Sequence, residues 1–122
     1  MKYAAYMTRG EHWYFDSRDL SPITEAEWLD YARRDPELRL ITHNRLRCLN
    51  TGQEWTQLRK DERLWDWEPA GGRSSTGPHA YAFEWHRNGI IVRCLDPELL
   101  AKAKAIARVF NARVIGDDDD VL

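Results

Sequence analysis

This sequence lacks the long apolar runs that mark membrane proteins. No stretch of its 122 residues approaches the roughly 18 consecutive apolar residues that a membrane-spanning helix needs. We expect no signal peptide in its first residues, because Thr8, Arg9 and Glu11 interrupt their apolar run. We therefore expect a cytoplasmic protein with no membrane contact.

Cysteine is scarce, and the sequence contains no metal-binding pattern. Cys48 and Cys94 are the two cysteines, and they form no Cys-x-x-Cys pair. In a cytoplasmic protein we expect both to be reduced, buried and small apolar side chains. The four histidines follow no HxxxH or HExxH spacing. The sequence therefore predicts neither a metal nor another cofactor.

Motifs for catalysis and for nucleotide binding are absent as well. There is no G-x-S-x-G, no P-loop and no G-x-G-x-x-G. The formal net charge of −2 argues against a nucleic-acid binder, although arginine is favoured over lysine. We expect a protein that is not an enzyme. The alternative is a small enzyme or ligand-binding domain with a site near Glu84, His86 and Arg93.

What the sequence does contain is a core and a surplus of tryptophan. Hydrophobic residues make up 43% of the chain, which predicts one folded domain over residues 1–122. Six residues are Trp, whose indole N–H needs a partner when it is buried. This number suggests that some of them lie in a groove or a contact surface.

One helix is expected over residues 24–34. Thr24 and Glu27 form a T-x-x-E capping box, in which each side chain satisfies a backbone N–H of the other. Ile23 before the cap and Trp28 within the helix fit a hydrophobic staple. The helix should bury Trp28 and end before the proline that follows it.

A second helix should begin at Asp96-Pro97, where the missing proline N–H costs nothing. Apolar residues then recur at three- and four-residue spacing: Leu99, Ala103, Ile106, Ala107 and Phe110. Asn111 tolerates a left-handed conformation and should end the helix.

The clearest strand signal is a hairpin around Asn88-Gly89, a two-residue turn in which both positions tolerate positive φ. That turn would pair Phe83 with Cys94, Trp85 with Val92, and Glu84 with Arg93. Apolar side chains would then fill one face, while the other face carries an ion pair.

Further strands are expected at 3–8, 12–15, 39–43, 46–49, 55–58, 64–67 and 112–115. Together these elements predict an α+β fold with a mainly antiparallel sheet and two helices packed on one face. The order is roughly strand, helix, four strands, helix and strand. A flexible loop is expected at 69–78 and an acidic tail at 117–120.

Two parts of the chain resemble a known group of proteins. These are ITEAEWL at 23–29 with DPEL at 35–38, and WHRNGIIV at 85–92 with DPE at 96–98 and NARVIGDD at 111–118. Both are similar to small bacterial proteins that resemble the immunity proteins of polymorphic or contact-delivered toxins. The resemblance implies a protein that neutralises a cognate toxin by stoichiometric occlusion of its active site.

The candidate residues for binding such a partner lie in three places. Trp65 and Trp67 share one strand face, with Asp66 between them, and this face either contacts a partner or faces the helices. Arg73 lies in the expected loop. The acidic run of Asp117, Asp118, Asp119 and Asp120 would dock on a basic surface.

Overall fold

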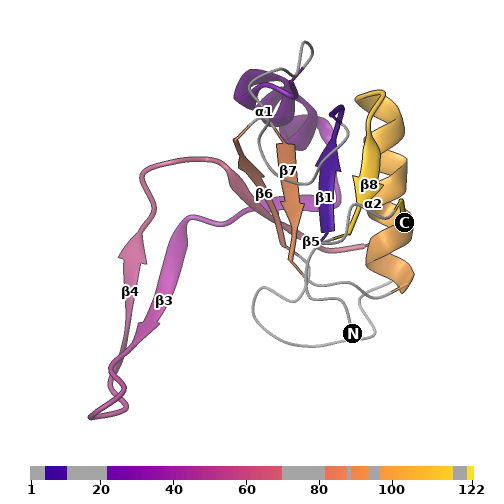
Figure 1. Ribbon diagram of the computed structural model, residues 1–122. Coiled ribbons are helices and arrows are strands. Elements are labelled where there is room, and N and C mark those ends of the chain that lie inside the picture. Colours follow the sequence, from indigo (N-terminus) through magenta and orange to yellow (C-terminus); the bar gives the residue numbers. More distant parts are fainter. Residues whose placement is uncertain (1–4, 11–21, 70–81, 88, 94–96, 117–120) are drawn as a thin grey trace.

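The computed structural model describes residues 5–10, 22–69, 82–87, 89–93, 97–116 and 121–122. Within them lie the helices α1 (Glu25–Arg34) and α2 (Pro97–Val109). One sheet contains β1 (Ala5–Thr8), β2 (Leu38–Leu40), β5 (Leu64–Trp67), β6 (Ala82–His86), β7 (Gly89–Val92) and β8 (Arg113–Ile115). The strands β3 (His43–Arg47) and β4 (Glu54–Leu58) form a separate hairpin. This confirms the predicted α+β class (Figure 1).

The capping box determines where α1 begins. The Thr24 hydroxyl accepts a hydrogen bond from the Glu27 backbone N–H, and the Glu27 carboxylate accepts one from the Thr24 N–H. Ile23 and Trp28 are both fully buried, as a hydrophobic staple requires. At the other end Asp35 is in an extended conformation, and Pro36 follows it. The predicted boundaries of this helix are confirmed.

The apolar stripe of α2 is buried as predicted. Leu99, Ala103, Ile106 and Ala107 face the core. Asn111 has φ 53°, so it adopts the left-handed conformation that ends a helix. The Ala112 N–H donates to the Ala107 carbonyl beyond this point, at 2.9 Å.

All described strand pairs in the large sheet are antiparallel, and the strand order is β2-β5-β6-β7-β1-β8. Six strands lie between the two helices in the chain. This is the number of separate segments predicted there, at 39–43, 46–49, 55–58 and 64–67 and in the hairpin, although the rough order counted only four. The strand expected at 12–15 lies outside the described residues, as does most of the loop expected at 69–78.

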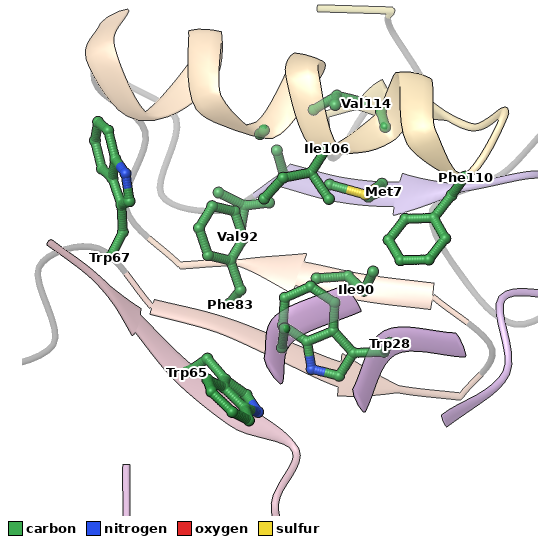
Figure 2. Packing of buried hydrophobic residues seen from close by; sticks show 14 of the residues in the cluster. Met7, Trp28, Trp65, Trp67, Phe83, Ile90, Val92, Ile106, Phe110 and Val114 are labelled. Atoms are coloured by element: carbon green, nitrogen blue, oxygen red, sulfur yellow. The ribbon is translucent and has the colours of Figure 1, made fainter. Parts of the chain in front are cut away.

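Both helices pack on one face of this sheet. A single apolar cluster joins Trp28 of α1 and Ile106 of α2 to inward residues of the strands, among them Met7, Phe83 and Val92. Figure 2 shows these side chains gathered between α2 and the strands beneath it. No helix in the described part of the chain is long and apolar enough to cross a membrane.

The β6–β7 hairpin has a different register from the predicted one. Phe83 pairs with Val92, Glu84 with Ile91, and Trp85 with Ile90. Gly89, predicted in the turn, pairs with His86 instead, and Arg87 takes the positive φ of 48°. Because the partners move by two residues, Phe83, Trp85 and Val92 still face the core. The Glu84–Arg93 ion pair also forms, now diagonally across the strands.

Gly89 explains why the predicted turn position is wrong. A Cβ atom on Gly89 would lie 2.9 Å from the Met7 carbonyl oxygen of β1. The glycine is thus needed for close approach between two strands, and it pairs with His86 within the ladder.

Candidate interaction surface

The β3–β4 hairpin, residues 43–58, extends away from the large sheet and from both helices (Figure 1). We call it the arm. Its strands pair from His43 opposite Leu58 to Arg47 opposite Glu54. At the tip the Cys48 carbonyl accepts from the Gly52 N–H and the Cys48 N–H donates to the Gln53 carbonyl, both at 2.8 Å. These bonds close a short loop in which Gly52 has φ 72°.

None of the arm residues belongs to the core cluster. All five residues of β4 are exposed. Three of the five large apolar side chains that the described part of the chain exposes are on the arm: Leu49 at 96%, Trp55 at 48% and Leu58 at 65%. A two-stranded hairpin of this kind is only marginally stable by itself in water. Burying one leucine of this kind in a partner contributes roughly 1.5–3 kcal/mol.

The two faces of the arm follow from its register. Leu46 pairs with Trp55 on one face, and Leu58 lies on the opposite face across from His43. Leu49 lies in the loop at the tip. Exposed apolar groups therefore occur on both faces and at the end.

The arm is fastened to the large sheet at its base by Arg59. The Arg59 backbone N–H donates to the Thr42 carbonyl at 2.8 Å. Its guanidinium donates to the Asn44 side-chain oxygen at 2.8 Å and to Asp61 at 3.0 Å. The same group lies 3.6 Å from the Glu84 carboxylate on β6. Arg59 is thus a largely buried side chain that links the arm, through Asn44 on β3, to the large sheet, through Glu84 on β6.

The tryptophans predicted as candidate contacts face inward. Trp65 and Trp67 are each 6% exposed and belong to the core cluster, as Figure 2 shows. The Trp65 indole donates to the Glu62 carbonyl at 2.7 Å, and the Trp67 indole donates to the Glu37 carboxylate at 3.1 Å. Of the two alternatives for this strand face, the structure shows the one toward the helices.

Of the remaining candidate residues, only Asp66 lies in the part of the chain that the structure describes. Asp66 is half-buried, and its carboxylate accepts from the Trp67 backbone N–H at 2.9 Å. Arg73 of the loop and the acidic run Asp117–Asp120 lie outside the described residues. Their role in binding a partner stays a prediction.

At the alternative site near Glu84, His86 and Arg93, the charged groups pair with one another. The Glu84 carboxylate is paired with Arg93 and lies near Arg59. His86 is exposed at the end of β6. Among the described residues no group of three or more His, Cys, Asp or Glu side chains is arranged to hold a metal ion.

A shallow, open cleft of about 420 Å3 lies instead between the end of α1 and α2. Lys102 bridges Asp35 and Glu37 there, at 2.8 Å to each, and the Tyr31 hydroxyl donates to Asp35 at 2.7 Å. Arg34 completes the charged lining.

Both carboxylates of this cleft are paired with Lys102. Burial would raise the pKa of Asp35, but the hydrogen bonds from Lys102 and Tyr31 outweigh it, and the pKa lies below its ordinary value. The hydrogen bond from Lys102 likewise lowers the pKa of Glu37. Burial raises the pKa of the Tyr31 hydroxyl, and the bond to Asp35 adds to this. The network therefore ties the elements together, and we assign no ligand to it.

Sequence reasoning missed the arm as a surface. It predicted strands and a turn near these positions, but it did not show that they leave the sheet. The available signal was β4 itself, Glu-Trp-Thr-Gln-Leu, in which no face is continuously apolar. Cys48 is also half-buried on the arm rather than buried in the core, and Cys94 lies outside the described residues.

Comparisons of this chain with models of protein families, with curated protein sequences and with solved structures find no match. The resemblance to immunity proteins therefore stays a prediction. Function must be inferred from the geometry.

Proposed function

We propose that this chain is an interaction protein of the immunity type, which binds a cognate toxin one-to-one and neutralises it by covering its active site. The observation that supports this proposal is the arm, because it exposes Leu49, Trp55 and Leu58 outside the core. Exposed aromatic and apolar side chains gathered on one projection are typical of binding surfaces. The resemblance noted in the sequence supplies the class of partner.

Stoichiometric action requires no chemistry from this chain. Occlusion depends on shape and charge complementarity over an interface, for which a surface of about 800 Å2 on each partner is usual. The arm supplies exposed apolar side chains for such an interface, whereas Lys102 in the cleft already pairs with Asp35 and Glu37.

The test uses the product of the gene adjacent to the one encoding this chain. Cells that express that protein are expected to stop growing, and co-expression of this chain should restore growth. With purified proteins, titration of the toxic activity should end sharply at one equivalent of this chain.

The shape of the titration separates the two classes of function. A binding protein must be present in equimolar amount, whereas an enzyme that destroys the toxin or its product would protect cells at a small fraction of one equivalent. Absence of both a complex and growth rescue, with this chain soluble and folded, would contradict the proposal.

A further inference from the structure

The exposed apolar groups of the arm are distributed around it rather than along one side. Trp55 and Leu46 lie on one face, Leu58 on the other, and Leu49 at the tip. A flat partner could cover only one of these surfaces at a time. A cleft with two walls and a floor would contact all of them.

The arm also differs in charge from the rest of the chain. Its sequence holds Arg45 and Arg47 against one acid, Glu54, whereas the whole chain has a formal charge of −2. Arg47 is exposed, and its register position places it on the face that carries Leu58, opposite Glu54. A complementary cleft would therefore present carboxylates near its apolar walls.

The base of the arm is already ordered before any partner binds. Arg59 joins Asn44 of β3 to Asp61 and Glu84 through its guanidinium. A surface that is fixed in advance loses less conformational freedom on binding than a flexible segment.

Pairing of β3 with β3 of a second copy of this chain is unfavourable. In two-fold antiparallel pairing of β3 with itself, residues 43, 45 and 47 of one copy can only pair among the same positions of the other, because paired residues must share a face. These positions are His43, Arg45 and Arg47, so basic groups would meet.

We propose that the arm inserts into the active cleft of the partner protein, a cleft with apolar walls that carry carboxylates. This inference rests on the proposed function and specifies the surface that performs it. It assigns the central contact to Trp55, the floor of the cleft to Leu49, and the second wall to Leu58.

The test measures the affinity of single variants for the neighbouring gene product by calorimetry. Trp55→Ala should weaken binding by on the order of 30-fold, and Leu58→Ser by roughly tenfold. Leu49→Ser separates a loss of binding from a loss of folding, because a side chain that is 96% exposed contributes almost nothing to the stability of the fold. It should weaken binding without changing thermal unfolding.

The matched control is Val109→Ser on α2, where the side chain is 63% exposed, close to the value for Leu58. It should bind like the wild type. Arg47→Gln should slow association at low salt and flatten its dependence on ionic strength, whereas Arg108→Gln on α2 should not.

The outcomes separate the two proposals. If the wild type forms the complex and the three arm variants bind equally well, the inference about the arm is wrong and the proposed function stands. If the wild type forms no complex, both fail. If light scattering shows that the arm variants dissociate a dimer of this chain instead, the arm serves self-association and the inference is overturned.

Discussion

Gly89 lies where β7 approaches β1 so closely that a side chain has no room. In Gly89→Ala, the new Cβ would meet the Met7 carbonyl oxygen at 2.9 Å, and this neighbour is backbone that cannot rotate away. We expect the free energy of unfolding to fall by about 1–3 kcal/mol, as in other overpacked sites. Urea denaturation followed by circular dichroism measures this change.

Gly52→Ala is the control for that prediction. Its φ of 72° makes an alanine unfavourable, but the nearest atom to a Cβ there is 3.8 Å away. Because the arm lies outside the core, the urea midpoint should stay close to that of the wild type. Equal midpoints for Gly89→Ala and the wild type would contradict the steric explanation.

Single residues also show which features of the fold the sequence predicts and which it does not. The capping box of Thr24 and Glu27 is local, and so it was predictable from four consecutive residues. The role of Gly89 depends on Met7, more than 80 residues away in the chain, and no local pattern contains that contact. The same holds for Trp65 and Trp67, whose alternation was evident but whose inward direction depends on where the helices pack.

At the scale of elements, Lys102 joins α2 to the segment that follows α1. Lys102→Met would leave the Asp35 carboxylate, 6% exposed, without its cation. We expect the free energy of unfolding at pH 7 to fall by about 3 kcal/mol, because one partner of a buried pair is removed. Chemical denaturation at several pH values measures the loss.

The pH dependence of this loss follows from the signs of the shifts. The pKa values of Asp35 and Glu37 are lowered in the folded protein, so their stabilisation is present above unfolded-state values of about 4 and disappears as the pH falls below them. The pKa of Lys102 is raised despite its burial, so its contribution persists up to a pH of about 10. The difference between Lys102→Met and the wild type should therefore shrink toward pH 3.

Lys104→Met is the matched control, since Lys104 is on the same helix and forms no ion pair with a described residue. It should change stability little at any pH. A difference between Lys102→Met and the wild type that is as large at pH 3 as at pH 7 would show that lost packing, not charge, is responsible.

Arg59 links the arm to the large sheet through Asn44 and Glu84. In Arg59→Met the bonds to Asn44 and Asp61 are lost while the apolar stem is kept. We expect amide hydrogens of β3 and β4 to exchange at least about tenfold faster, because the hairpin alone is marginal. Hydrogen exchange of the core strands should be unchanged, and Lys60→Met, at an exposed neighbouring position, should behave like the wild type.

The strands of the arm were predictable, but their separate sheet was not. Residues 43–58 contain two short segments around a turn containing Gly52, and this local pattern predicts a hairpin. Which strand pairs with the large sheet depends on distant partners, here β2 with β5. The candidate surface was missed for this reason.

For the whole molecule, the arm should be dispensable for folding. The Thr42 carbonyl already accepts from the Arg59 N–H, which is the geometry that closes a two-residue turn. Replacing residues 43–58 with Asn-Gly should leave the six-stranded sheet and both helices intact. We expect the thermal midpoint to stay within about 5 °C of the wild type, and differential scanning calorimetry tests this.

The same shortened chain should lose the growth rescue described above while remaining folded. A shortened chain that is unfolded at 25 °C would show that the arm contributes to the core. A folded one that still protects cells would place the binding surface elsewhere, for example at the acidic run Asp117–Asp120.

The position of β1 in the sheet has a consequence for how the chain is made. β1 (Ala5–Thr8) is hydrogen-bonded between β7 and β8, so its two neighbours come from residues 89–92 and 113–115. During translation β1 therefore cannot pair until β7 has been synthesised, and its second neighbour, β8, follows later still. The hairpins β3–β4 and β6–β7 join segments that are close in the sequence and can close early, whereas the β1–β7 and β1–β8 pairs join distant segments and form later. Until then the backbone N–H and C=O groups of β1 are unpaired, and this is the condition in which a strand pairs with other chains.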